Sequence, residues 1–212
     1  MGKMEFIQTA CGYDEADVKI YDFENSKKTG DIGEQRIIKF LNDLDSTKEV
    51  TDVTNIKEFQ EKDIDLIITN KDGSIETVEI KTDTYPTNFF YETLSDVERN
   101  TAGCLEKSLA DFLYYYFINI GKLYIIPMKP FREWFHLNKV ANKNIISKKT
   151  VPNKTRYGKY MSEGYTIPRE FFEQTFPHYY KKYHLPIDEE SGNAICEWPV
   201  QRPSFCVKYS LF

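Results

Sequence analysis

Two short segments rich in isoleucine and valine constrain this chain more than any other feature of its sequence. They are residues 63–69 (DIDLIIT) and 75–81 (IETVEIK), and the turn residues Asn70-Lys71-Asp72-Gly73 lie between them. β-Branched runs on both sides of an Asp-Gly turn are typical of a β-hairpin. A three-residue loop, Lys71-Asp72-Gly73, would place Gly73 in the left-handed conformation, which suits glycine, and would align Asn70 with Ser74.

The register of this hairpin decides which side chains share a face. Counting back from the loop sets Asp65 directly opposite Glu79, with Lys81 two residues further along the same face. A two-residue loop would send Asp65 and Glu79 to opposite faces. The longer loop therefore predicts two carboxylates and one ammonium group on one surface. The other face is expected to be buried, with the pairs Leu66–Val78 and Ile64–Ile80.

Two carboxylates and a lysine on one surface have a chemical use. Carboxylates held close together repel each other and favour a divalent cation between them, and oxygen ligands with open positions suit Mg²⁺. A lysine beside the metal can position or deprotonate a water molecule and stabilise a pentavalent phosphate. Asp, Glu and Lys are also ordinary surface residues, so a solvated hairpin face is the alternative interpretation.

The same residues resemble the signature of the PD-(D/E)XK nuclease superfamily. Asp65 precedes an apolar run, Glu79-Ile80-Lys81 ends the next strand, and Ile64 stands at the Pro position, which is often replaced. The resemblance implies Mg²⁺ or Mn²⁺ bound by Asp65 and Glu79, with the Ile80 carbonyl as a third ligand. It implies that Lys81 orients the attacking water or holds the scissile phosphate. Asp63 shares the face of Asp65 and is the rival metal ligand.

Composition sets broad limits on the protein. A chain of 212 residues with 41% hydrophobic residues can bury one core, with or without an extension. Its net charge of −5 argues against a protein that coats nucleic acid but is compatible with an acidic metal site. The four cysteines form no C-x-x-C pair, which argues against zinc. Without a visible signal peptide or long apolar run, we expect a cytoplasmic protein with reduced thiols and no membrane partner.

A helix is expected over residues 29–44, where apolar residues recur at helical spacing. Glu34 extends the inward-facing stripe of this helix. Two interpretations of Glu34 stay open: the acid that the first core helix often supplies in the superfamily, or a capping box with Asp31. Gly33 would let substrate or a neighbouring strand approach closely. Residues 49–54 alternate like a strand that pairs beside residues 64–69. An earlier strand is expected over residues 18–23.

The elements after Lys81 complete the expected αβββαβ order. Residues 88–92 are expected to form a strand, with Glu92 as an accessory candidate turned towards the site. Residues 105–117 predict a core helix, in which Lys107 and Asp111 form an i,i+4 pair. A strand over residues 122–127 and a short helix from Pro130 follow. The apolar positions of the expected helix are Leu105, Leu109, Phe112, Leu113 and Tyr116.

Further residues resemble a phage-associated branch of restriction-endonuclease-like proteins. In that branch Glu-Leu-Lys-Thr-Asp precedes an Asn-(apolar)-Glu segment and then a Ser-Gly-Ile…Ala-Asp helix start. Here the matching segments are residues 79–83 (EIKTD), Asn88 to Glu92, and residues 103–111, which contain Gly-Cys-Leu, Ser108 and Ala110-Asp111. Thr101-Ala102-Gly103 stands where the branch has Ser-Gly. The resemblance covers residues 29–135.

The last third of the chain separates its charges. No acidic residue occurs between Glu133 and Glu163. The segment is either a solvated loop or a nucleic-acid-binding segment that follows phosphates, with Tyr157 and Tyr160 able to stack on bases. His178 and His184 are expected to be surface or partly packed residues. The tail from Pro186 is expected to pack on the core. The basic residues of the segment over 139–159 are Lys139, Lys143, Lys148, Lys149, Lys154, Arg156 and Lys159.

These observations together predict an α/β protein with a restriction-endonuclease-like core, in which a mixed central sheet is flanked by helices. Residues 1–135 would form the nuclease-like core and residues 136–212 a C-terminal extension packed on it. The predicted function is Mg²⁺-dependent endo- or exonucleolytic cleavage of nucleic acid, with DNA as the expected partner, in a bacterial or phage-infected cell. Many relatives act as dimers, so a homodimer is possible. The alternatives are an inactive nucleic-acid- or protein-binding accessory module on the same fold, and a structural subunit.

Overall fold

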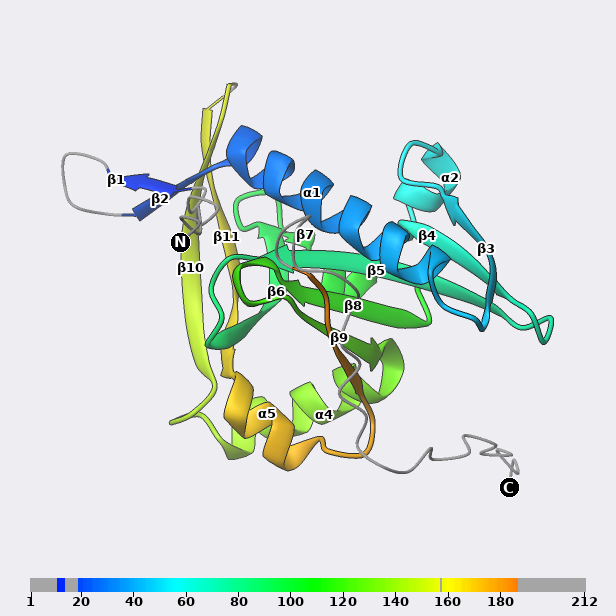
Figure 1. Ribbon diagram of the computed structural model, residues 1–212. Coiled ribbons are helices and arrows are strands. Elements are labelled where there is room, and N and C mark those ends of the chain that lie inside the picture. Colours follow the sequence, from blue (N-terminus) through cyan, green and yellow to red (C-terminus); the bar gives the residue numbers. More distant parts are fainter. Residues whose placement is uncertain (1–10, 14–18, 157, 187–212) are drawn as a thin grey trace, which may run out of the picture.

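The computed structural model describes residues 11–13, 19–156 and 158–186, and it contains two six-stranded sheets and several helices (Figure 1). The expected strand over residues 18–23 is present as β2, whereas the tail after Pro186 lies outside the described residues. The elements in chain order are β1 (Cys11–Tyr13), β2 (Lys19–Asp22), α1 (Phe23–Asn42), β3 (Thr47–Asp52), α2 (Lys57–Gln60), β4 (Leu66–Asn70), β5 (Ile75–Asp83), β6 (Asn88–Asp96), β7 (Thr101–Ala102), α3 (Cys104–Lys107), β8 (Phe112–Phe117), η1 (Ile118–Ile120), β9 (Lys122–Pro127), α4 (Met128–Ala141), β10 (Ser147–Thr155), β11 (Gly158–Pro168), α5 (Arg169–Thr175) and β12 (Lys181–His184).

The central sheet has the strand order β12-β9-β8-β5-β4-β3, and the second sheet has the order β1-β2-β10-β11-β6-β7. Both sheets are mixed: β5 pairs with β8 in parallel in the first, and β10 pairs with β2 in parallel in the second. Antiparallel pairs join the remaining neighbours, among them β3–β4, β4–β5 and β6–β11. The protein is therefore an α/β protein with mixed sheets flanked by helices, as the sequence predicts.

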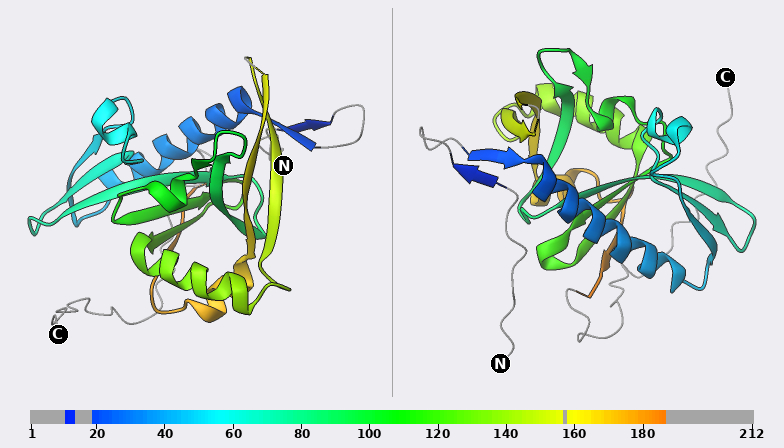
Figure 2. Two further views of the ribbon diagram at one scale, coloured as in Figure 1. Left: turned by 180° about the vertical axis from the view of Figure 1, so that it is seen from behind. Right: turned by 90° about the horizontal axis from the view of Figure 1, so that it is seen from above.

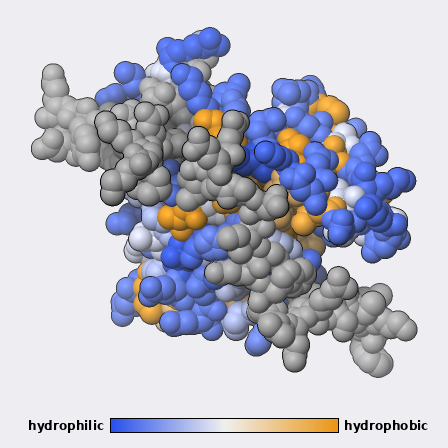
Figure 3. All heavy atoms as spheres, viewed as in Figure 1, coloured by the Kyte–Doolittle hydropathy of each residue, from blue (hydrophilic) through white to orange (hydrophobic). Residues whose placement is uncertain are grey.

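The helices cover opposite faces of the central sheet (Figures 1 and 2). On one face, Ile37, Phe40 and Leu41 of α1 pack against Leu66 of β4 and Val78 of β5. On the other face, an aromatic core gathers residues from α4, α5 and β6, namely Phe131, Trp134, Phe135, Phe172, Phe89 and Tyr91. Large aromatic side chains bury much apolar area each, so this second core is the larger contribution to folding. The face in Figure 3 is mostly hydrophilic, with apolar residues in small separate patches.

The hairpin β4–β5 has the predicted register. Leu66 pairs with Val78 and Thr69 with Ile75, and the backbone N–H of Asn70 donates to the Ser74 carbonyl at 2.9 Å. Gly73 has a φ of 88°, the left-handed conformation that the three-residue loop requires. The prediction that Leu66 and Val78 face a buried layer is confirmed, because both have 0% exposure beneath α1.

The predicted contact between Ile64 and Ile80 is wrong. Ile64 joins the aromatic core on the other face of the sheet, whereas Ile80 packs on the α1 side. Asp63 has a φ of 45°, and the Ile64 N–H donates to the Phe59 carbonyl, so the chain turns before β4 begins at Leu66. The alternation of side chains between the two faces of the sheet holds within β4, which begins at Leu66, and does not extend back to position 64.

Helix α1 begins at Phe23, six residues before the expected start. Asp31 thus lies inside the helix, where its carboxylate has no free helix end to cap, and the capping-box interpretation of Glu34 is wrong. The expected close approach at Gly33 is confirmed. A Cβ atom at position 33 would lie 2.0 Å from Oγ1 of Thr82 in β5, so the missing side chain lets the helix reach the strand.

The expected helix over residues 105–117 is wrong. Only Cys104–Lys107 is helical, and Phe112–Phe117 forms β8, the strand parallel to β5. Leu109, expected in the core, is 65% exposed, while Leu113 to Phe117 are all buried. A continuous apolar run fits both a helix and a strand that is buried on both faces, so periodicity alone does not separate them. Asp111 pairs with Thr77, not with Lys107.

The segment after residue 135 contributes strands to both sheets. The expected boundary at residue 135 falls within α4, β10 and β11 extend the second sheet beside β6, and β12 adds an edge to the central sheet. The basic segment is not a loop, since Ser147–Thr155 is strand β10. His178 is exposed and His184 is partly buried. In the described part of the chain, no helix has the length and apolar character needed to cross a membrane.

Candidate functional site

Asp65 and Glu79 meet at the point where β4 starts beside β5. The Asp65 N–H donates to the Val78 carbonyl at 2.8 Å, and Oδ2 of Asp65 accepts the Ile80 N–H at 2.7 Å. The Asp65 and Glu79 carboxyl groups are close enough for each to influence the pKa of the other. Glu79 is 8% exposed, which makes this a nearly buried pair of acids.

Burial and repulsion raise the pKa of both acids. Burial is the largest influence on the pKa of Glu79, which lies well above its usual range, and Asp65 and Asp63 raise it further. Burial also raises the pKa of Asp65 to about 6, although the Ile80 N–H opposes the change, and Asp63 and Asp52 add repulsion. A positive charge placed between the two acids would relieve this repulsion.

Lys81 follows Glu79 on the same face of β5 and is half-buried. Burial alone would lower the pKa of Lys81, but the neighbouring carboxylates of Glu92, Asp83 and Glu79 raise it above its usual range. The ammonium group also lies 5.9 Å from the centroid of the Phe90 ring. Lys81 is therefore a protonated cation at neutral pH, held beside the acid pair by the surrounding charges.

Glu34 reaches the same region from α1. Burial raises its pKa to about 7, and repulsion from Asp52, Asp65 and Asp31 adds to the shift. Asp52, at the end of β3, accepts a hydrogen bond from the Thr54 hydroxyl at 2.6 Å. Because Gly33 brings α1 against β5, the next residue of the helix is placed beside the strands that carry the acid pair. Glu34 therefore lies near Asp52 and Asp65, on the side of α1 that faces the strands.

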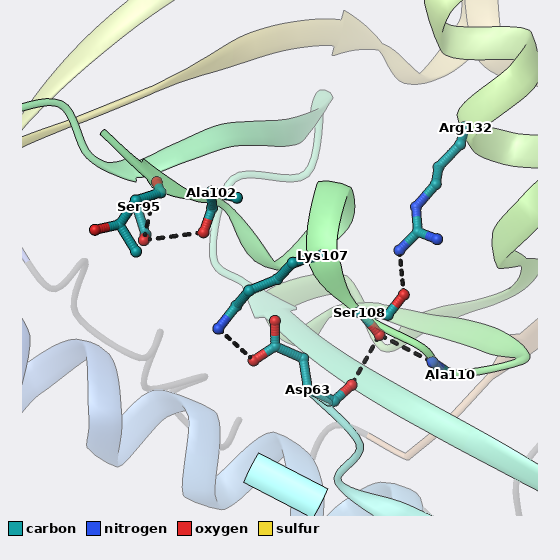
Figure 4. A network of polar contacts seen from close by, with 8 residues as sticks. Asp63, Ser95, Ala102, Lys107, Ser108, Ala110 and Arg132 are labelled. Carbon is teal, nitrogen blue, oxygen red and sulfur yellow. Dashed lines mark hydrogen bonds and ion pairs between the residues drawn. The ribbon is translucent and has the colours of Figure 1, made fainter. Parts of the chain in front are cut away.

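Asp63 makes a different set of contacts from Asp65 (Figure 4). Its Oδ1 accepts from Nζ of Lys107 at 3.0 Å, and its carbonyl accepts the Ser108 hydroxyl at 2.8 Å. Arg132 donates to the Ser108 carbonyl and, at 2.6 Å, to the Leu105 carbonyl, which fixes the chain around Lys107. Oδ2 of Asp63 is buried without a partner among the described residues. Asp63 is thus close enough to repel Glu79 but is bound to a lysine.

Two further groups border the site from the second sheet and α3. Glu92 of β6 is among the charges that raise the pKa of Lys81, and the free thiol of Cys104 lies near the same lysine. Burial raises the pKa of Cys104 to about 12, so it is a neutral thiol there. Gly103 touches Glu92, because a Cβ atom at position 103 would lie 2.5 Å from the Glu92 carbonyl oxygen. The expectation that Glu92 turns towards the site agrees with these contacts.

The structure therefore gathers Asp65, Glu79, Lys81, Glu34, Asp63 and Glu92, and it adds residues that the sequence did not reveal. We call Glu34, Asp52, Asp63, Asp65 and Glu79 the carboxylate cluster. Asp52 could have been found from its place at the end of a strand expected beside residues 64–69. Lys107 and Cys104 could not, because Lys107 was expected to pair with Asp111 along a helix, whereas it pairs with Asp63 from a distant part of the chain.

The basic residues of the last third of the chain lie on α4, on the strands β10 and β11, and in the connections that follow α4 and β10. Nζ of Lys148 pairs with Oε2 of Glu163 at 2.9 Å, and Lys139 lies over the rings of Phe135 and Tyr165. Lys143, Lys149 and Lys154 are exposed. Arg156 and Lys159 lie near the turn between the two strands, where Lys154 stands directly opposite Lys159. Like charges in directly opposed positions weaken strand pairing, so an anion bound there would relieve a repulsion.

The side chains fit a magnesium ion bound through few protein ligands. No group of three or more His, Cys, Asp or Glu side chains in the described part of the chain is arranged to hold a metal ion. Mg²⁺, however, often binds through one or two carboxylates and retains several water molecules. Asp65 and Glu79 could supply those two carboxylates, and the buried, unpartnered Oδ2 of Asp63 lies beside them.

Comparison with protein-family models, with curated proteins and with solved structures finds no match to this chain. What can be said about function therefore comes from the residues and their geometry.

Proposed function

We propose that this protein is a Mg²⁺- or Mn²⁺-dependent nuclease that hydrolyses phosphodiester bonds of nucleic acid, with DNA as the substrate, on a restriction-endonuclease-like core. The observation that carries the proposal is the meeting of Asp65 and Glu79 on one face of neighbouring strands, with Lys81 two residues further on. The order α1, β3, β4, β5, with β8 parallel to β5, supports the fold assignment.

The proposed roles follow from the contacts. Asp65 and Glu79 would hold the metal ion, with the Ile80 carbonyl as the third protein ligand. When bound, the ion would polarise the phosphate and lower the pKa of its water. Lys81 is assigned to holding the scissile phosphate or donating a hydrogen bond to the attacking water, because its raised pKa keeps it protonated. Glu34 is the acid supplied by the helix, and Glu92 is an accessory group.

Asp63 becomes the less favoured metal ligand on this geometry. One of its carboxylate oxygens is already bound by Lys107, so a metal ion would compete with that ammonium group. Asp65 has no lysine partner among the described residues and points to the same space as Glu79. The basic residues of β10 and β11 are proposed to bind phosphates outside the site.

A second candidate function is an accessory module that binds nucleic acid or protein without catalysis. The lack of three convergent acidic or imidazole ligands among the described residues favours it. The two functions differ in their response to metal, since an accessory module would bind DNA equally with and without Mg²⁺. The nuclease should cut DNA only when the metal is added and should stop when EDTA removes it.

The test uses variants of the site together with a control on the same hairpin. Asp65→Ala and Lys81→Ala should each reduce cleavage at least about a hundredfold, because the first removes a ligand of the metal ion and the second removes a cation that stabilises the reacting phosphate. Lys71→Ala, at the exposed turn of the hairpin, should cut like the parent chain. Circular dichroism and thermal melting would show that folding is nearly intact. Unimpaired cutting by either site variant would refute the assignment.

The substrate form is a separate question for the same assay. Labelled single-stranded, duplex and branched DNA, matching RNA, and linear or circular molecules should be incubated with Mg²⁺ or Mn²⁺, each with an EDTA control. Cleavage of circles would indicate an endonuclease, and dependence on free ends an exonuclease. No metal-dependent cleavage of any substrate, together with metal-independent binding, would favour the accessory module.

A further inference from the structure

Helix α4 has an apolar outer face in addition to its buried one. Its inner face contributes Phe131 and Phe135 to the aromatic core, and both are almost completely buried. On the opposite side of the helix, Leu137 and Val140 are each 73% exposed. They lie three residues apart and so form one stripe. A second apolar stripe on a helix that is already packed indicates a surface for another molecule.

A third exposed apolar residue follows the helix. Ile145 comes four residues after Ala141, where α4 ends, and is 43% exposed. We call Leu137, Val140 and Ile145 the α4 patch. They are three of the eight large apolar side chains exposed in the described part of the chain.

The charges at the two ends of the patch have opposite signs. Glu133 is exposed one turn before Leu137, and Lys143 is exposed one residue after Asn142, which ends the helix. Within the described residues neither of them makes an ion pair. When two copies of this surface pack antiparallel, the acidic end of each copy meets the basic end of the other.

We propose that the α4 patch is a self-association surface, and that its partner is a second copy of this chain packed with the two α4 helices antiparallel across a two-fold axis. Such an axis sets the same patch against itself. An axis between positions 138 and 139 brings Leu137 of one copy against Val140 of the other. The same axis brings Glu133 of each copy close to Lys143 of the other.

A second copy fits this surface better than a partner of a single charge. An acidic peptide would be attracted to Lys143 but repelled by Glu133, and a basic one would meet the reverse. In the antiparallel dimer both charges are paired, because Glu133 of each copy lies close to Lys143 of the other. The patch is small, because a helix of 14 residues is about 21 Å long. Stable interfaces bury about 800 Å² per partner, so the dimer is expected to be weak, with a dissociation constant in the micromolar range.

Sedimentation velocity over about 1–300 µM protein tests the proposal without relying on the proposed nuclease activity. The parent chain should change from monomer to dimer across that range. Leu137→Asp and, separately, Val140→Asp should raise the dissociation constant at least about tenfold, because each buries a charge among apolar side chains. Ile75→Asp is the matched control. Ile75 is 65% exposed at the β4–β5 hairpin and lies outside the patch, so this variant should dimerise like the parent.

A charge exchange tests the antiparallel arrangement itself. Glu133→Lys and Lys143→Glu should each weaken the dimer severalfold, and the double variant should return most of the affinity because the pairs are restored with reversed signs. Circular dichroism confirms folding of every variant. A parent chain that stays monomeric up to 300 µM overturns the proposal. A dissociation constant that neither Leu137→Asp nor Val140→Asp changes also overturns it. So does a double charge variant that dimerises no more tightly than the weaker-binding of the two single charge variants.

Discussion

Glu34 illustrates how a single residue of the carboxylate cluster opposes folding at neutral pH. Its ordinary pKa of 4.5 is raised to about 7, mainly by burial and then by Asp52 and Asp65. A carboxyl group with a raised pKa holds its proton more tightly in the folded chain than in the unfolded one. Its contribution to stability is therefore fully present below about pH 4.5 and is lost as the pH rises towards 7.

This sign gives a prediction for Glu34→Gln. The variant should match the parent chain near pH 4 and should be more stable than the parent near pH 7.5. The gain should be on the order of 1 kcal/mol, after allowance for the partial exposure of Glu34. Urea unfolding at several pH values measures the difference. Glu49→Gln, at an exposed position of β3, is the control and should show no gain that depends on pH. A gain for Glu34→Gln that is the same at pH 4 and pH 7.5 would contradict the assignment.

The loss of stability that Glu34 causes at neutral pH is typical of a residue in a binding or catalytic site. A buried acid pair such as Asp65 and Glu79 raises the free energy of the folded chain unless a cation is bound between the acids. Proteins tend to carry such local costs at binding and catalytic sites, where replacement by neutral residues stabilises the fold but removes the activity. The same reasoning explains why Lys81 is held protonated, since it is the cation nearest to the pair on β5.

At the scale of elements, the contact between α1 and β5 depends on the glycine at position 33. Gly33→Ala should lower the free energy of unfolding by about 1–3 kcal/mol, because its methyl group would overlap Thr82 and push the helix off the strand. Gly30→Ala lies in the same helix with nothing within 4 Å of the new Cβ atom, and it should stabilise by up to about 1 kcal/mol through helix propensity. Chemical denaturation measures both changes.

A second substitution makes the cause of the Gly33 effect testable. Thr82→Ala removes the hydroxyl and methyl groups that the new Cβ atom would meet first, at 2.0 and 2.7 Å. The Gly33→Ala, Thr82→Ala double variant should therefore recover part of the stability that Gly33→Ala loses. Equal losses in the single and double variants would mean that backbone flexibility, not the close contact, explains the need for glycine.

Hairpin β4–β5 and strand β8 show which elements could be predicted from the sequence and which could not. Hairpin β4–β5 was predictable in register, because the loop chemistry at Gly73 and the alternation of its strands act within a few residues of each other. Strand β8 was not, because an aromatic run between α3 and β9 has no polar face to reveal its period. The acid pair lies on one hairpin and was found. Lys107 and Cys104 reach the site only through tertiary packing, which local patterns do not encode.

At the scale of the whole molecule, the paired strands β10 and β11 join β2 to β6 in the second sheet. Strand β11 pairs with β6, which carries Glu92, and β10 pairs with β2 next to α1 (Figure 1). Charges along these strands are therefore placed on the same sheet as one border of the candidate site. A nucleic-acid strand bound along them would reach the site without any large rearrangement of the fold.

The salt dependence of DNA binding tests this arrangement, and two neighbouring lysines provide a matched comparison. Lys149 is exposed with no ion pair among the described residues, whereas Lys148 already pairs with Glu163 at 2.9 Å. Each lysine that contacts a phosphate adds about 0.7–0.9 to the slope of log K against log salt concentration, because counterions are released. Lys149→Gln should therefore lower the slope by about that amount, and the Lys149→Gln, Lys154→Gln double variant by about twice as much. Lys148→Gln should change the slope less, because Glu163 neutralises the charge of Lys148.

Binding measured by fluorescence anisotropy from about 50 to 300 mM salt, with EDTA present to prevent cleavage, gives the slopes. Equal slopes for the parent and the double variant would place DNA elsewhere on the molecule, even if the metal-dependent chemistry at Asp65 and Glu79 is established.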